Sequence, residues 1–269
     1  MAIESVDCSR RSKAGGFIGG ACIGMLGGLI GLGGAEFRLP LLIGAFQFAA
    51  LEAIIVNKAM SLFVVASALP FRMGTIPFDG IASHWNIIAN LLAGSLLGAW
   101  VGASWATRLK SETLYRVLAA LLVAIAVVLI VGHDADGASR PMFTDVPQMA
   151  AGVVAGFSIG VVASLMGVAG GELLIPTLIL LFGADVKLAG SLSLTVSLPT
   201  MLVGFARYSH DSAFAILSRN RGFVLVMAAG SIIGSFIGAG LLGIIPSSVL
   251  LPALALILLV SAMKVWRHK

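Results

Sequence analysis

Charged residues are scarce in this chain: they make up 11% of its 269 residues, whereas soluble proteins contain about 25%. Hydrophobic residues reach 59%, and the mean hydropathy is +1.06. Cysteine is scarcer still, because Cys8 and Cys22 are the only two and provide neither a disulfide framework nor the spacing of a metal site. Since charges are costly in hydrocarbon, the composition excludes an ordinary soluble protein and indicates a chain that crosses a membrane several times.

Sequence motifs of catalysis and of nucleotide binding are also absent. No Gly-x-x-x-x-Gly-Lys-[Ser/Thr] phosphate loop occurs, and the four histidines form no His-x-x-x-His pair. We therefore expect no enzyme, no metal site and no cofactor. The formal net charge of +5 does not predict a nucleic-acid partner, because the basic residues lie beside apolar segments and act as topology signals.

Ten apolar segments follow one another along the chain, five in each half. They are continuous rather than alternating, as between residues 117 and 131, so helices are predicted instead of the strands of a barrel. The segments cover residues 14–33, 36–50, 52–72, 83–106 and 113–132, then 148–169, 172–184, 186–208, 221–242 and 247–264. The second segment of each half is shorter than the roughly 20 residues that span a bilayer, which predicts a half-helix or a re-entrant segment.

The two halves match each other without a gap at an offset of 136 residues. The matching positions include Gly31, Gly34, Glu36 and Pro40 with Gly167, Gly170, Glu172 and Pro176, and Gly94, Gly98 and Gly102 with Gly230, Gly234 and Gly238. We expect the last six glycines, spaced by four, to serve close helix packing. A duplicated apolar chain is typical of transporters. We predict an all-α polytopic membrane protein with a first repeat at 1–132, an extracytoplasmic connection at 133–147 and a second repeat at 148–269.

Lysine and arginine predict the orientation of the repeats. They flank the segments at Arg10, Arg11, Lys13, Arg108, Lys110, Arg207, Arg219, Arg221 and 264–269. If each short segment belongs to a down-and-back pair, the positive-inside rule places both termini in the cytoplasm and inverts the second repeat. If each short pair formed one broken span, Arg108 would face outward, which is the weaker alternative. The first segment is similar to a signal peptide, but its Gly-rich run recurs near 153–171 and we expect it to be retained.

A glycine break followed by glutamate and proline occurs in both repeats, at 27–40 and 163–176. A helix that restarts after such a break presents unpaired N–H groups and the positive end of its dipole, which favour an anion. Glycine also lets the backbone approach a ligand closely. The candidate substrate-binding residues of the breaks are Gly33, Gly34, Ala35, Gly170 and Gly171. Two breaks that face each other near the midplane predict a small anion site.

Charged residues accompany the breaks. Glu36 and Glu172 recur at equivalent positions, and an ionisable residue at membrane depth indicates a function, here charge balance or proton coupling. The alternative is a place in the first helical turn, stabilised by the helix dipole. Arg38 aligns with Leu174 and is either a cation of the site or a partner of Glu36.

Polar residues in the third segment of each repeat complete the predicted site. Asn57 and Ser61 are four residues apart and share one helical face, as do Ser193 and Ser197 at the equivalent positions. We interpret all four as substrate-binding residues, with hydrogen bonding between helices as the alternative. Lys58 has three alternative interpretations: it balances the charge of the anion, it pairs with a glutamate, or it extends to the membrane interface.

The paired glycine breaks, the stretch Asn57-Lys58-Ala-Met-Ser61 and the glycines spaced by four before Arg108 carry a resemblance. In these features, nearly the whole chain resembles the TauE/SafE family of sulfite and sulfonate exporters. The resemblance implies export of small organosulfur anions, such as sulfite, sulfoacetate or other sulfonates, across the cytoplasmic (inner) membrane of a bacterium.

We therefore predict a secondary transporter that works by alternating access in the lipid bilayer, with H+ or Na+ as the coupling ion. The alternatives are an anion channel and an ion-coupled cation transporter that uses Glu36 and Glu172. The sequence also leaves a homo-oligomer open.

Overall fold

The computed structural model describes residues 13–30, 34–73, 82–131, 145–184 and 186–240, and near the C-terminus residues 256, 259–260, 262–263 and 265–267. These residues form helices and, within the described ranges, no strands. Four helices are long and apolar enough to cross a membrane: Trp85–Ala106, Val146–Met166, Leu188–Tyr208 and Arg221–Gly238. The prediction of an all-α, multi-pass membrane protein is thus confirmed.

The helices follow the predicted segments closely. They are α1 (Lys13–Ile30), α2 (Ala35–Gly44), α3 (Ala50–Met73), α5 (Trp85–Ala106), α6 (Ser111–Val131), α7 (Asp145–Met166), α8 (Gly171–Phe182), α9 (Val186–Tyr208), the 3-10 turn η2 (Ser212–Ala215), α10 (Ile216–Arg219) and α11 (Arg221–Gly240). The second segments form short helices, with 10 residues in α2 and 12 in α8. The predicted connection at 133–147 and the segment at 247–264 lie largely outside the described residues.

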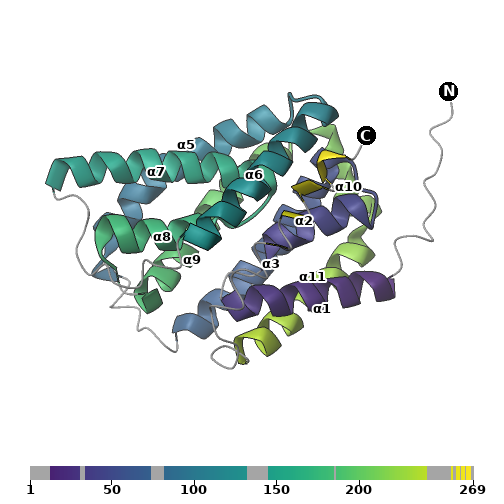
Figure 1. The fold of residues 1–269 in the computed structure, drawn as a ribbon, viewed down its shortest axis with the longest axis horizontal. Helices are drawn as coiled ribbons and strands as arrows, with labels where there is room; N and C mark the ends of the chain where they lie inside the picture. Colours follow the sequence, from purple (N-terminus) through teal and green to yellow (C-terminus); the bar gives the residue numbers. More distant parts are fainter. Residues whose placement is uncertain are drawn as a thin grey trace.

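Two pairs of closely packed helices lie on opposite sides of the molecule: α1 runs beside α11, and α5 runs beside α7 (Figure 1). Glycines let the backbones touch in both. A Cβ atom at Gly98 of α5 would overlap the carbonyl oxygen of Phe157, and one at Gly234 of α11 would overlap that of Ala21. We call these contacts the α1–α11 seam and the α5–α7 seam. The predicted packing role is confirmed for Gly94, Gly98, Gly102, Gly230 and Gly234, and it stays a prediction for Gly238.

The seams correspond to each other under the 136-residue offset. Gly98 meets residue 157 in one seam, and Gly234 meets residue 21 in the other. Each seam therefore joins the first helix of one sequence half to the fourth helix of the other half, in parallel orientation. The two sequence halves thus exchange their fourth helices. The 136-residue offset alone does not predict this exchange, because the offset identifies helices that are equivalent and not helices that are neighbours.

Gly98→Ala is expected to lower the free energy of unfolding by about 1–3 kcal/mol, the usual cost of overpacking, because the added methyl group meets backbone that cannot move aside. Gly222→Ala is the matched control, since its Cβ would meet only the Lys13 side chain, at 3.5 Å. Thermal unfolding of the purified protein in detergent measures both. Equal midpoints for the two variants would contradict the account of the α5–α7 seam.

Hydrogen bonds between helices establish their directions. Gln148 near the start of α7 donates to the carbonyl oxygen of Leu181 near the end of α8, 2.7 Å away, so α8 folds back along α7. The hydroxyls of Ser95 and Thr200 lie 2.7 Å apart, and Arg207 donates to Ser104 over 2.8 Å, so α5 and α9 run parallel. Since α5 also runs parallel to α7, α7 and α9 run in the same direction, and α8 runs in the opposite direction between them in the chain.

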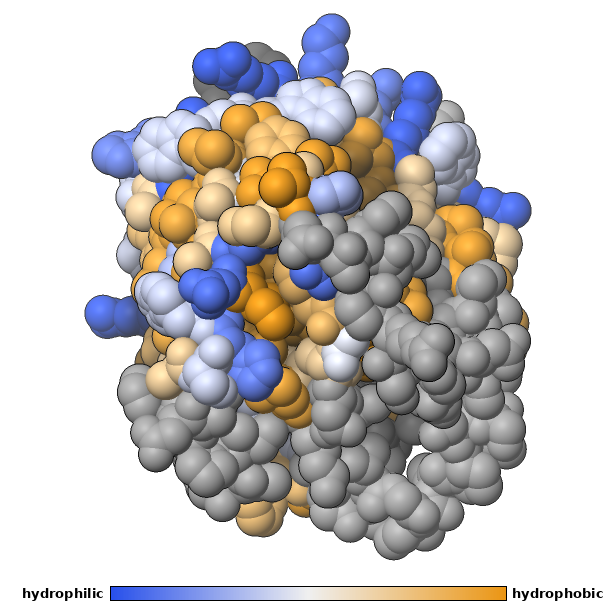
Figure 2. Space-filling model, turned by 90° about the vertical axis from the view of Figure 1, so that its left-hand side faces the viewer, coloured by the Kyte–Doolittle hydropathy of each residue, from blue (hydrophilic) through white to orange (hydrophobic). Residues whose placement is uncertain are grey.

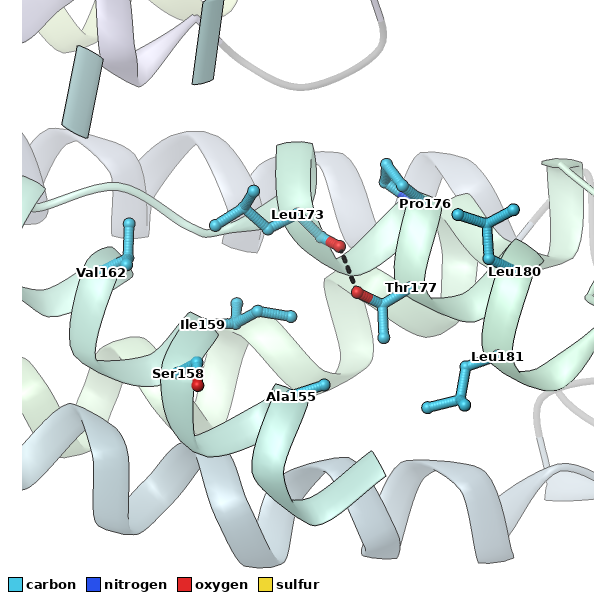
Figure 3. Close-up of a pocket in the computed structure, with 9 residues that line it drawn as sticks. All are labelled: Ala155, Ser158, Ile159, Val162, Leu173, Pro176, Thr177, Leu180 and Leu181. Atoms are coloured by element: carbon cyan, nitrogen blue, oxygen red, sulfur yellow. Dashed lines mark hydrogen bonds between the residues drawn. The ribbon is translucent and has the colours of Figure 1, made fainter. Parts of the chain in front are cut away.

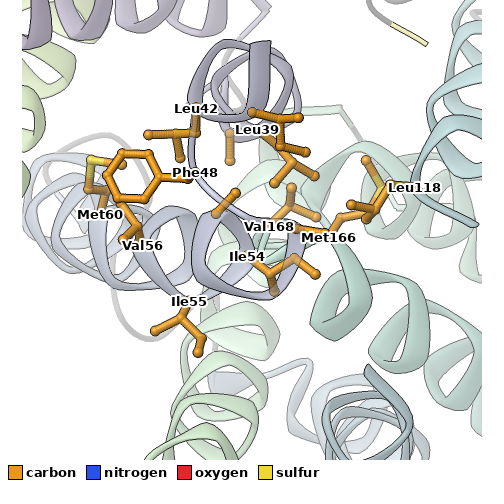
Figure 4. Close-up of a cluster of buried hydrophobic side chains, with 14 of the residues drawn as sticks. Leu39, Leu42, Phe48, Ile54, Ile55, Val56, Met60, Leu118, Met166 and Val168 are labelled. Atoms are coloured by element: carbon orange, nitrogen blue, oxygen red, sulfur yellow. The ribbon is translucent and has the colours of Figure 1, made fainter. Parts of the chain in front are cut away.

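The outer surface is largely apolar, and Figure 2 shows broad hydrophobic areas on one face. Exposed large side chains include Trp85, Leu97, Trp105, Val154 and Phe236. Inside, a buried hydrophobic cluster joins α2 and α3 to the residues that follow α7. Figure 4 shows Leu39, Ile54, Leu118, Met166 and Val168 in this cluster. The cluster packs α2 and the end of α7 against α3, where the predicted site lies.

Candidate functional site

A glycine precedes each of the short helices α2 and α8. Gly34 has a φ of 66° and precedes α2, and Gly170 has a φ of 81° and precedes α8. Such positive φ values favour glycine. Neither helix receives a side-chain hydrogen bond from its N-cap residue, so the first-turn N–H groups of Ala35 and Gly171 have no capping side chain. Gly33 and the side chain of Glu172 lie outside the described residues.

Gly167 ends helix α7 and brings it against α3. Its φ is 68°, and the N–H of Val168 donates to the carbonyl of Ala163 over 3.0 Å, the pattern of a Schellman helix end. A Cβ atom at Gly167 would overlap the carbonyl oxygen of Ile54 on α3. Glycine is thus required here by both the backbone conformation and the close approach.

Asn57 connects both breaks. Its Nδ2 atom donates to the carbonyl oxygen of Ala35, at the start of α2, over 2.9 Å and to that of Met166, at the end of α7, over 3.1 Å. The side chain is fully buried. Its Oδ1 atom has no hydrogen-bond partner among the described residues. The breaks of the two halves therefore meet at one amide, whose hydrogens are both engaged and whose oxygen is available.

Lys58 points toward the end of α7 instead of the membrane interface. Its Nζ atom lies 3.3 Å from the hydroxyl of Ser164 and 3.4 Å from the carbonyl oxygen of Ala163, and the side chain is fully buried. The Tyr208 hydroxyl donates to the carbonyl oxygen of Ser164 over 2.9 Å. The sequence interpretation missed Ser164 and Tyr208. Tyr208 could have been found from the sequence, because the chain contains only two tyrosines and a tyrosine in an apolar segment needs a hydrogen-bond partner for its hydroxyl.

The predicted serines differ in their partners. Ser61 donates to the carbonyl oxygen of Gly167 over 3.4 Å, so it shares with Asn57 the face of α3 that meets this break. Ser193 donates over 2.9 Å to Gly190 of its own helix. The buried hydroxyl of Ser197 has no hydrogen-bond partner within the described part of the chain. Ser197 thus remains a free donor, whereas the other two hydroxyls contact backbone carbonyls.

The fully buried charged side chains of the described residues come from the first half. They are Glu36, Arg38 and Lys58, with at most 1% of each exposed. Glu36 lies in the first turn of α2 and interacts electrostatically with Arg38. The described buried side chains thus include one carboxylate and two basic groups, and buried charges require a partner.

A separate cavity of about 470 Å³ lies between α7 and α8. Apolar side chains line it (Figure 3), and the hydroxyl of Thr177 already donates to Leu173 of its own helix over 2.7 Å. Ser158 likewise bonds to Val154. The cavity therefore offers no charge to an anion.

Among the described residues, no group of three or more His, Cys, Asp and Glu could hold a metal ion.

Comparison with known proteins agrees with this arrangement. Residues 14–267 match the family model described as Sulfite exporter TauE/SafE. The chain belongs to the TauE/SafE family. This TauE/SafE chain is also similar to a Haemophilus influenzae protein named "Probable membrane transporter protein", with 26% identity over 169 residues. The match covers 59% of this chain and 60% of that relative's length. No solved structure matches the chain.

The family match covers both halves of the sequence of this TauE/SafE protein and therefore includes residues 27–40, 163–176 and the Asn57 to Ser61 stretch. The resemblance drawn from the glycine breaks and from the Asn57 to Ser61 stretch is confirmed. The roles of the individual residues remain predictions.

Proposed function

We propose that this chain is a secondary transporter that exports small organosulfur anions, such as sulfite, sulfoacetate or other sulfonates, by alternating access. The observation that carries the proposal is that the basic side chains of Arg38 and Lys58 are buried near the start of α2 and the end of α7, which Asn57 joins. The family description and the relative's name both refer to transport and not to an enzyme.

The chemistry of the site supports an anion. Lys58 and Arg38 supply positive charge, and the first-turn N–H groups at Ala35 and Gly171 supply oriented donors. The hydroxyl of Ser197 is a further buried donor. A tetrahedral or pyramidal oxyanion presents several acceptor oxygens, which match a set of donors better than a simple halide does. Gly33, Gly34, Gly170, Ser61 and Ser193 complete the proposed binding set.

The helix directions support inverted repeats. Because α7 and α9 run parallel with α8 between them in the opposite direction, each repeat makes an odd number of passes. The fifth segment predicted at 247–264 would then carry the chain back to the side of the N-terminus. The second repeat would begin on the side opposite to the first, with the breaks of both near the midplane, as in many transporters.

Basic residues support cytoplasmic termini. The Lys13 side chain lies beside Gly222 at the start of α11, and Arg108 and Arg207 lie at the ends of the parallel helices α5 and α9. They gather at one end of the bundle, as the positive-inside rule expects for the cytoplasmic side.

A membrane potential that is negative inside favours anion exit by about 2.3 kcal/mol per charge at 100 mV. Glu36 and Glu172 are the candidates for coupling to H+ or Na+.

Uptake of radiolabelled sulfite into proteoliposomes tests the proposal. We expect saturable uptake that unlabelled sulfoacetate inhibits and that an equal concentration of a divalent metal cation leaves unchanged. Protein-free liposomes serve as the control, and the variant Arg38→Leu, which removes a proposed cation of the site, should reduce the uptake. An imposed proton gradient shows whether Glu36→Gln abolishes coupling.

Absence of uptake for every organosulfur anion, with the protein folded, would overturn the substrate assignment. Metal-cation uptake that depends on Glu36 and Glu172 would favour the cation transporter. Uptake that does not saturate would favour a channel.

A further inference from the structure

We infer that the two rigid bodies that move during transport are not the two sequence halves, because the halves exchange their fourth helices. The first body consists of α1, α2, α3 and α11, and the second body consists of α7, α8, α9 and α5. This inference rests on the proposed alternating access and names the surfaces between which the movement takes place.

The most extensive helix contacts of the described fold carry the inference. They are α1 with α11, α5 with α7 and α5 with α9, and each joins helices from different sequence halves. If one sequence half moved as a unit against the other, these three helix contacts would all have to separate.

The seams oppose such a separation. Gly20 approaches the carbonyl oxygen of Met227 in one seam, and Gly156 approaches that of Leu91 at the equivalent position of the other. Interfaces of this kind are close-packed and transmit movement instead of absorbing it. A shift by one residue would bring larger side chains against backbone, so each seam moves as one unit.

Each exchanged fourth helix also contacts the third helix of the body to which it belongs: α5 contacts α9, and α11 contacts α3. In the second body, Ser95 of α5 and Thr200 of α9 form a buried contact of 2.7 Å, and Arg207 bonds to Ser104 over 2.8 Å. In the first body, α11 packs along α3. The exchange therefore extends beyond a single helix pair.

The contacts between the two bodies are less extensive than the seams: α3 packs along α9, and Gly167 approaches the carbonyl oxygen of Ile54. α3 donates to the end of α7 through Asn57, Lys58 and Ser61, over distances of 3.1 to 3.4 Å. These bonds are longer than the 2.7 and 2.8 Å bonds inside the second body, and hydrogen bonds weaken as they lengthen. They also lie at the proposed anion site. An anion that attracts Lys58 would withdraw it from Ser164 and loosen this contact between the bodies.

Four exposed positions related by the offset allow a symmetric test. They are Ile18 on α1, Val154 on α7, Leu97 on α5 and Ile233 on α11. Spin labels are attached in pairs to cysteines at these positions, in the full chain with Cys8 and Cys22 replaced by serine. Distance distributions are then measured by double electron–electron resonance in proteoliposomes, with and without sulfite, and flux is measured on the same samples.

The exchanged bodies predict narrow, unchanged distances for the pairs 18/233 and 97/154. The pairs 18/97 and 154/233, which lie within single sequence halves, should give broad distributions or shift by roughly 5 Å, about one helical turn. The opposite pattern would overturn the inference and identify the halves as the moving bodies. Four narrow distances that sulfite leaves unchanged, in samples with saturable flux, would also overturn it. Absent sulfite flux with the expected pattern would overturn the substrate assignment and leave the exchanged bodies standing.

Discussion

Lys58→Met is expected to raise the KM for sulfite by about 100-fold or more while the protein stays folded. Among the described buried side chains, Lys58 supplies the excess positive charge, since Glu36 and Arg38 carry opposite charges. Two unit charges 4 Å apart interact by about 4 kcal/mol at an effective dielectric constant of 20, and 1.4 kcal/mol corresponds to a tenfold change in affinity. Methionine retains most of the apolar stem and its packing. Sulfite uptake at a series of concentrations measures the change.

Leu194→Met is the matched control for Lys58→Met. Residue 194 stands at the position equivalent to Lys58 in the second half, so the same side chain is introduced without loss of a charge. Its KM should stay within a factor of two of the unaltered protein. If Lys58→Met also leaves the KM within that range, Lys58 does not contact the anion and only holds the end of α7.

Asn57→Ala is expected to lower the free energy of unfolding by about 2–5 kcal/mol. The variant removes both donors from the carbonyl oxygens of Ala35 and Met166, and each buried group left without a partner costs about 1–3 kcal/mol. Since these bonds hold the two breaks together, the maximal rate of transport should also fall. Thermal unfolding in detergent and uptake at saturating sulfite measure the two effects.

Ser193→Ala is the control for Asn57→Ala, because Ser193 occupies the equivalent position and bonds only within α9. Its unfolding should change by less than about 1 kcal/mol, as expected for a single local hydrogen bond. A larger loss for Ser193→Ala than for Asn57→Ala would show that the bonds of Asn57 do not hold the breaks together.

The apolar segments and the breaks could be predicted from sequence because both are local. Runs of hydrophobic residues determine where helices lie, and Gly34 and Gly170 are glycines at positive φ that each precede a short helix. The helical spacing of Asn57 and Ser61 also correctly placed both on one face of α3. These are properties of a segment and its immediate neighbours.

The partners of these residues could not be predicted, because they depend on packing between distant segments. Spacing on α3 says nothing about the end of α7, whose carbonyl oxygens accept from Asn57 and Ser61. Lys58 was open to three interpretations until the approach of Ser164 on α7 decided its direction. The exchange of fourth helices was hidden for the same reason, since the offset relates helices that are equivalent and not helices that touch.

Counterflow tests the central claim, alternating access around an anion site, most directly. Proteoliposomes are loaded with a high concentration of unlabelled sulfite and diluted into a trace of radiolabelled sulfite, with the membrane potential clamped at zero. The account predicts that the label accumulates transiently inside, above its external concentration, because inward and outward steps share one site, and that Lys58→Met abolishes the accumulation. A label that only equilibrates, however high the internal sulfite, would contradict it and indicate a passive pore.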